Sequence, residues 1–123
     1  MFGLSPARPL SCSPVQSSEV FGLDAAPTIG VDLGGTNTRA GVVSAEGEIL
    51  GRGRRSTPLP EGAAAVVKGI ADCVRDAAQD AGIELKDTDG LGVGSPGPLD
   101  PYTGVIISPE NLQCMHGVRL KDE

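Results

Sequence analysis

Apolar residues alternate with small or polar residues in the first part of the chain that carries a regular pattern. Ile29, Val31 and Leu33 occupy every second position of residues 28–33. Successive side chains of a strand point to opposite faces of a sheet, so this spacing predicts a strand that is buried on one face.

Two further strands are predicted at residues 38–43 and 48–55. Turn-forming residues at 34–37, which we call the glycine turn, and at 44–47 separate the three runs. Gly47 is free to adopt the positive φ that such a turn requires. Strands joined by connections this short predict an antiparallel meander.

The spacing of apolar residues then changes from two to three and four, which predicts an amphipathic helix over residues 61–81. Gly82 is placed to cap its C-terminus. Cys73 lies beside the apolar stripe and is expected in the core. The stripe is formed by Val67, Ile70, Ala71, Val74, Ala77, Ala78 and Ala81.

Short elements follow the helix. We expect a buried strand at 91–94, a stiff loop at 95–98 that we call the proline loop, a turn at 100–104, a strand at 105–107 and a loop at 109–112. Three strands, a helix and another strand, in that order, predict an α/β fold with a mixed sheet.

The composition divides the chain into two parts. Residues 1–26 are rich in Ser and Pro and have no apolar period, so we expect a flexible tail. Residues 27–123 carry the regular pattern. The total of 123 residues fits one small domain or one lobe of a larger protein.

Charge and cysteine content narrow the function classes. The formal net charge of −6 argues against a nucleic-acid surface. No apolar run approaches the roughly 20 residues that a membrane-spanning helix needs. Three widely spaced cysteines and the lack of a secretory signal favour the reducing cytoplasm.

The glycine turn and Asp32, near the end of the preceding strand, are candidates for binding phosphate. Gly34 and Gly35 let the backbone bend so that successive N–H groups face one anion. Thr36 and Asn37 add a hydroxyl and an amide, and Asp32 could hold a Mg²⁺-bound water beside the phosphates. The alternative is an ordinary hairpin turn with a capping Asp. It is not a Walker A loop, because no Lys follows the glycines and a strand follows the turn.

Residues 92–97 match the G-x-G-x-x-G pattern of dinucleotide-binding folds. That motif requires a helix to open at its third glycine, and the Pro and Gly residues that follow exclude one. We interpret the segment as a stiff loop at the end of a strand, in which Pro96 and Pro98 restrict the backbone around Gly97. Gly97 can then approach a ligand closely, unless the loop is only a structural turn.

Three arginines and a Cys-x-His pair have simpler explanations than a binding site. Arg52, Arg54 and Arg55 are interpreted as a solvated strand edge that discourages further pairing. Cys114 and His116 supply only two ligands, fewer than zinc requires, so no metal site is expected. Arg39 could add positive charge beside the glycine turn, unless strand alternation directs it elsewhere.

In order and spacing, these segments resemble the N-terminal half of the ROK family (repressors, open reading frames and sugar kinases), and bacterial glucokinases most closely. The resemblance covers residues 28–120. It is carried by residues 29–39, 92–100, 104–106 and 110–112.

The resemblance implies an actin-like ATPase fold (ribonuclease H-like), of which residues 27–123 form the N-terminal lobe. It further implies that ATP phosphorylates a hexose, with glucose the expected one. Asp32 and the glycine turn would face the ATP phosphates and Mg²⁺. Gly97, Pro98, Glu110 and Asn111 would line the sugar, and the full-length protein would be a homodimer.

The sequence departs from the family pattern in three ways. The family's catalytic Asp, in an Asn-Asp pair, and its zinc-binding Cys and His cluster would lie beyond the end of this chain. We therefore expect no catalytic residue and no sugar phosphorylation from it alone. Residues 113–115 stand where glucokinases have Pro-Gly-Trp, which leaves the sugar preference open.

Two other functions are kept as alternatives. A sugar-responsive repressor of the same family would carry a helix-turn-helix domain before the glycine turn, and the Ser/Pro-rich residues 1–26 do not suit one. A non-catalytic fragment that binds a partner would expose apolar surface that the rest of a kinase normally covers.

Overall fold

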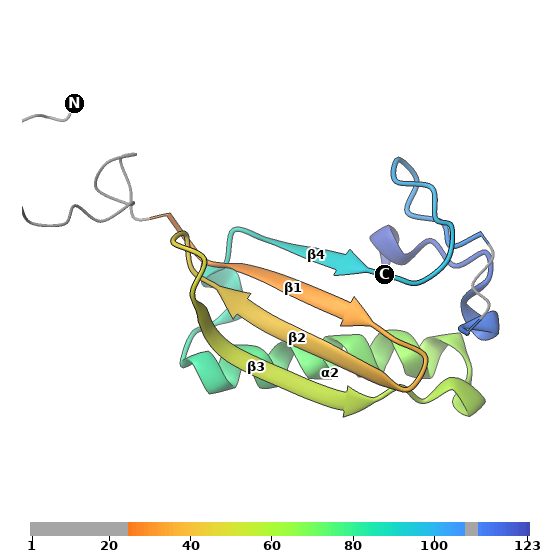
Figure 1. The fold of residues 1–123 in the computed structure, drawn as a ribbon, viewed down its shortest axis with the longest axis horizontal. Helices are drawn as coiled ribbons and strands as arrows, with labels where there is room; N and C mark the ends of the chain where they lie inside the picture. Colours follow the sequence, from red (N-terminus) through yellow and green to blue (C-terminus); the bar gives the residue numbers. More distant parts are fainter. Residues whose placement is uncertain (1–24, 108–110) are drawn as a thin grey trace, which may run out of the picture.

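The computed structural model describes residues 25–107 and 111–123. Within them, four strands form one mixed sheet: β1 (Thr28–Leu33), β2 (Asn37–Val43), β3 (Ile49–Ser56) and β4 (Gly90–Gly94). The order across the sheet is β3-β2-β1-β4 (Figure 1). β1, β2 and β3 are the antiparallel meander that the sequence predicts, and β4 lies parallel to β1. The expectation that this last strand is buried is wrong, because β4 is an edge strand whose residues are exposed apart from the half-buried Val93.

One face of the sheet packs against the helix α2 (Ala63–Ala81). The alternating residues Ile29, Val31 and Leu33 point to this face and are buried, as predicted. The buried stripe of the helix differs slightly from the predicted one, because Val66 and Cys73 are central and Val67, Ala71 and Ala81 lie half-buried at its sides. The full set of buried helix residues is Val66, Ile70, Cys73, Val74, Ala77 and Ala78.

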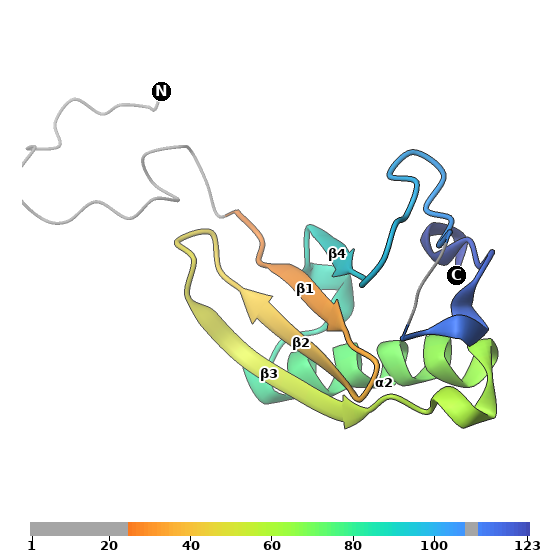
Figure 2. The same ribbon diagram turned by 45° about the vertical axis from the view of Figure 1, so that its right-hand side comes forward.

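The helix covers β2 and β3 and barely reaches β1 (Figure 2). Two glycines of β3 permit this close approach. A Cβ added at Gly51 would collide with the carbonyl oxygen of Ala77, and one at Gly53 with that of Cys73. Side chains larger than hydrogen would therefore force the helix away from the strand.

Glycines define both ends of α2. The prediction that the helix starts at residue 61 is wrong by two residues, because a 3₁₀ turn, η1 (Leu59–Glu61), comes first. Gly62, with φ +94°, then separates this turn from the α-helix. At the other end Gly82 has φ +72° and donates its amide to the carbonyls of Ala78 and Gln79, which confirms the predicted cap.

The segment after β4 is mostly irregular. The strand expected at residues 105–107 is reduced to isolated bridges, Leu99 with Ile106 and Val105 with Arg119. The turn before it forms as predicted, because the Asp100 carboxylate accepts hydrogen bonds from the amides of Tyr102, at 2.8 Å, and Thr103, at 3.3 Å.

Short 3₁₀ turns complete the chain: η2 (Leu85–Asp87), η3 (Gln113–Met115) and η4 (Leu120–Asp122). Ile106, Leu112 and Met115 are buried in the same core as α2 and the sheet. The irregular segment is thus held to the fold by apolar side chains. The predicted tail at 1–26 lies almost wholly outside the described residues.

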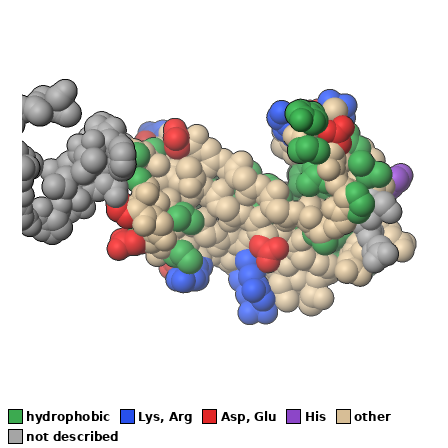
Figure 3. Space-filling model, turned by 45° about the horizontal axis from the view of Figure 1, so that its top comes forward, with side chains coloured by type: hydrophobic (Ala, Val, Ile, Leu, Met, Phe, Trp, Pro, Cys, Tyr) green, Lys and Arg blue, Asp and Glu red, His purple; other side chains and the backbone are tan. Residues whose placement is uncertain are grey.

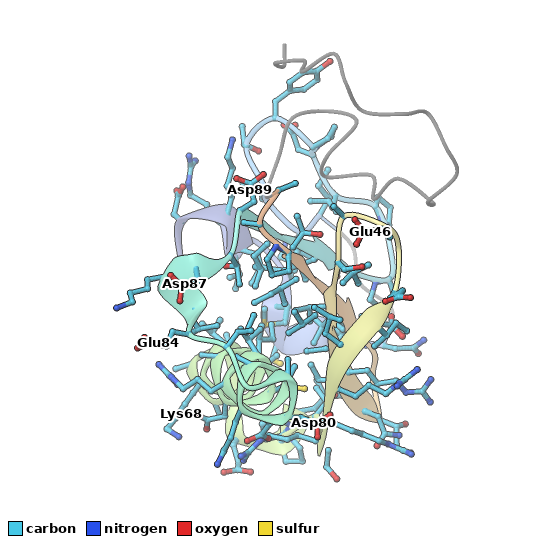
Figure 4. The ribbon with its side chains drawn as sticks, turned by 90° about the vertical axis from the view of Figure 1, so that its left-hand side faces the viewer. Glu46, Lys68, Asp80, Glu84, Asp87 and Asp89 are labelled. Carbon is cyan, nitrogen blue, oxygen red and sulfur yellow. The ribbon has the colours of Figure 1, made fainter. Side chains whose placement is uncertain are left out.

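Negative charge gathers at one end of the molecule. Figure 4 labels acidic side chains there from the β2–β3 turn, the end of α2 and the segment before β4, namely Glu46, Asp80, Glu84, Asp87 and Asp89. The glycine turn lies at the opposite end of the sheet (Figure 1). Across the described ranges, no helix is both long and apolar enough to cross a membrane.

Candidate functional site

The carboxyl ends of two parallel strands meet at one edge of the sheet. Asp32 on β1 is the register partner of Gly94, the last residue of β4. The glycine turn leaves β1, and the proline loop leaves β4, at this same edge. In open α/β sheets, ligands bind at such an edge, beyond the carboxyl ends of the strands.

The glycine turn is a tight hairpin connection between β1 and β2. The Gly34 amide donates to the Asn37 carbonyl at 3.0 Å, so it is used within the turn. Neither Gly34 nor Gly35 has a positive φ. Glycine is needed at 34 because a Cβ there would lie 2.7 Å from the Asn37 carbonyl oxygen.

The amides of Gly35 and Thr36 differ from that of Gly34. No acceptor in residues 25–107 or 111–123 pairs with either of them. Two neighbouring N–H groups in a tight turn are the donors that a phosphate oxygen needs.

A row of charged residues crosses the sheet face opposite α2. Asp32 is the register partner of Arg39, which is the partner of Arg54 on β3, and all three are exposed. Arg54 donates to the Asn37 side-chain oxygen at 3.4 Å. Figure 3 shows acidic and basic side chains adjacent to one another on this part of the surface. Arg39 therefore lies on the same face as Asp32, where its charge favours an anion.

Thr57 is a residue of this site that the sequence analysis missed. Its amide donates to the Thr36 carbonyl at 2.9 Å, and its hydroxyl donates to the Gly34 carbonyl at 2.7 Å. Thr57 is 23 residues from Gly34. No local pattern in one sequence could connect them, because the contact exists only once β3 lies beside β2.

The residues expected to line a sugar fall into two groups. Gly97, with φ +84°, and Pro98 are exposed on the proline loop, and the Pro98 carbonyl accepts from the Ile107 amide at 2.9 Å. Asn111 lies against the glycine turn, since a Cβ added at Gly35 would be 3.1 Å from both the Asn111 Cβ and its carbonyl oxygen. Glu110 lies outside the described residues.

A metal site and a surface depression are the other candidates for a functional site. The described residues contain no group of three or more Cys, His, Asp or Glu side chains that could hold a metal ion. A shallow depression of about 390 Å³ lies between the end of β3 and the first turns of α2. Three of its charged lining residues are in ion pairs, Arg55 with Asp76 at 2.6 Å and Lys68 with Asp72 at 2.7 Å.

Comparison with known proteins gives one consistent result. Residues 28–123 match the model of the ROK family. The chain is 35% identical over 95 residues to a glucokinase of Thermotoga maritima, covering 77% of this chain and 28% of that protein.

Solved structures agree with the sequence match. A ROK hexokinase from Thermus thermophilus superposes with a TM-score of 0.69 at 32% identity, over 78% of this chain and 30% of that one. A ROK family glucokinase from Streptomyces griseus, solved with glucose and AMPPNP, gives 0.68 at 33% identity, over 78% and 28%.

These relatives settle the fold class. The mixed sheet with its helix is the α/β arrangement of actin-like ATPase sugar kinases, as expected from the sequence. The chain spans less than a third of the length of each of these relatives. The chain belongs to the ROK family, whose model its residues 28–123 match.

Proposed function

We propose that this chain forms the phosphate-facing and sugar-facing parts of an ATP-dependent hexose kinase of the glucokinase type. One contact carries the proposal. Gly35, from the turn expected to face phosphate, lies against Asn111, from the loop expected to face sugar. Transfer of a phosphoryl group requires donor and acceptor to be held in such proximity.

The residues at the sheet edge fit a nucleotide phosphate. The Gly35 and Thr36 amides supply donors, and the Arg39 and Arg54 side chains add positive charge on the neighbouring face. Bound Mg²⁺ would neutralise charge on the phosphate oxygens, and Asp32 would hold it through water. A single carboxylate suits Mg²⁺, which keeps most of its own waters.

The sugar side of the proposal rests on Gly97, Pro98, Glu110 and Asn111. The Asn111 side chain offers both a donor and an acceptor for a sugar hydroxyl. The glucose complex of the Streptomyces griseus relative supports glucose as the hexose. We extend the proposal to a homodimeric, cytoplasmic enzyme.

The proposal is tested by ADP formation from ATP with glucose, using the complete product of the gene. Asp32→Asn is expected to reduce kcat by at least about tenfold and to raise the Mg²⁺ concentration required, because one of the metal's negative partners is lost. Gly30→Ala is a matched control, since Gly30 is exposed on the same strand and a Cβ there meets nothing within 4 Å.

Three results would contradict the proposal. They are an absence of glucose-dependent turnover, an Asp32→Asn variant as active as Gly30→Ala, and an unchanged response to Mg²⁺. Replacing glucose with mannose and other hexoses in the same assay identifies the preferred sugar.

A further inference from the structure

We propose that Thr57 is a positioning residue that orients the glycine turn toward phosphate, with Thr38 supporting it. This inference rests on the proposed function. Thr57 lies outside the glycine turn, directly after β3. It forms two hydrogen bonds to the backbone of the turn.

The two bonds fix the direction of the turn's peptide groups. The Thr57 hydroxyl holds the Gly34 carbonyl at 2.7 Å, and its amide holds the Thr36 carbonyl at 2.9 Å. A trans peptide directs its C=O and the following N–H in opposite directions. With the Gly34 carbonyl directed at Thr57, the Gly35 amide must therefore point away from β3.

The hydroxyl of Thr57 is itself held in one orientation. Its single proton goes to the Gly34 carbonyl, so in its 2.9 Å contact with the Thr38 hydroxyl it must accept. Both threonines are buried, with Thr38 2% and Thr57 8% exposed. Water cannot easily replace either bond.

A third contact ties this pair to the helix. The Cys73 thiol of α2 donates to the Thr38 carbonyl at 3.4 Å. The turn is thus connected through β3 and β2 to α2, and its orientation depends on buried contacts of the core.

Two substitutions at Thr57 distinguish a role in positioning the glycine turn from a role in the stability of the fold alone. Thr57→Val keeps the shape of the side chain but removes the donor to Gly34, whereas Thr57→Ser keeps the hydroxyl. Thr88→Val is the matched control, because the Thr88 hydroxyl also donates to a carbonyl at 2.7 Å, that of Leu85, which is distant from the turn.

The experiment measures KM for ATP, KM for glucose and kcat in the complete gene product. Thr57→Val is expected to raise KM for ATP about tenfold, the effect of one lost, well-placed hydrogen bond, with KM for glucose unchanged. Thr57→Ser should restore most of the ATP affinity. Thr88→Val should lower thermal stability without changing KM for ATP.

A second readout does not depend on turnover. In the 123-residue chain, the amide resonance of Gly35 is followed by NMR during titration with Mg·ATP. It is expected to shift in the wild type and the Thr57→Ser variant and to shift far less in Thr57→Val. Melting curves establish that each variant is folded at the temperature used.

The outcomes distinguish the two proposals. An active wild type whose Thr57→Val variant keeps its KM for ATP overturns the positioning role alone. An inactive wild type whose Gly35 amide still responds, and does so only with a hydroxyl at 57, overturns the kinase function and upholds the positioning role. A Gly35 amide whose resonance does not shift with Mg·ATP in any of the three forms overturns the positioning role, whatever the turnover.

Discussion

At the scale of single residues, the glycine turn depends on what surrounds each glycine. A side chain at Gly34 would meet the Asn37 carbonyl and one at Gly35 would meet Asn111, and neither glycine has a positive φ. Positions 47 and 82 favour glycine for a different reason, namely their backbone conformation. Gly47 has φ +88° and Gly82 has φ +72°, values that other residues rarely adopt.

We expect Gly34→Ala to destabilise the fold by about 1–3 kcal/mol, because its Cβ would lie 2.7 Å from a backbone oxygen that cannot rotate away. Urea denaturation measures the change. Gly30→Ala, with nothing within 4 Å of the added Cβ, should be as stable as the wild type or more so. Equal stability of the two variants would show that the turn has room for a side chain.

At this scale the sequence predicts roles for residues within a motif but does not reveal the residues that contact the motif from elsewhere in the chain. Asp32 and the glycines stand together in the chain, so their joint chemistry can be predicted from spacing. Thr57 and Thr38 meet Gly34 only through strand pairing, and their contact leaves no periodic signal. The proximity of Asn111 to Gly35 likewise needs the folded chain.

At the scale of elements, the packing contact between β3 and α2 determines how closely the helix approaches the sheet. We expect Gly53→Ala to cost about 1–3 kcal/mol, because its Cβ would collide with the Cys73 carbonyl oxygen. Gly41→Ala on β2 is the control, since its closest neighbours would be 3.9 Å away. A Gly53→Ala variant with the melting temperature of Gly41→Ala would contradict this packing.

An ion pair adds a pH-dependent interaction between β3 and α2. The Asp76 carboxylate on α2 accepts two hydrogen bonds from Arg55 on β3, at 2.6 and 3.0 Å. This partner lowers the pKa of Asp76 below its usual range. The pair therefore stabilises the fold fully above the ordinary carboxyl pKa of about 4, and its contribution disappears as the pH falls through the lowered value.

We accordingly expect Asp76→Asn to lose stability at neutral pH, and its stability to decrease less steeply than that of the wild type as the pH falls below about 4. Arg55→Gln should give the same flattening, and combining both should add little, because either change removes one shared interaction. Denaturation by urea at several pH values measures these slopes. Parallel pH profiles of wild type and variants would refute the role of the pair.

The elements that were predicted well are those whose signal is local. The meander and the helix follow from apolar spacing over many residues. Residues 105–107 have the composition of a strand, yet only Ile106 is fully buried and the segment forms single bridges. Strand formation needs a partner of matching length, which composition does not reveal.

At the scale of the whole molecule, the sheet is covered unevenly. α2 lies mainly over β2 and β3, whereas β4 is at the end of the strand order. Leu91 on β4 is 52% exposed, although its register partner Ile29 on β1 is 3% exposed. The apolar face of the sheet thus extends past the edge of the helix.

This uneven cover predicts that the chain binds apolar dyes through the β4 side. Leu91→Glu is expected to reduce the fluorescence of such a dye and any concentration-dependent self-association, with little change in melting temperature, because a half-exposed side chain contributes only part of its burial energy. Leu50→Glu is the control, since Leu50 is 42% exposed on the opposite edge strand. If the two variants reduce dye binding equally, the β4 side has no special role. If only Leu91→Glu reduces dye binding, the exposed apolar face of this chain lies on β4, at the end of the strand order beyond the edge of α2.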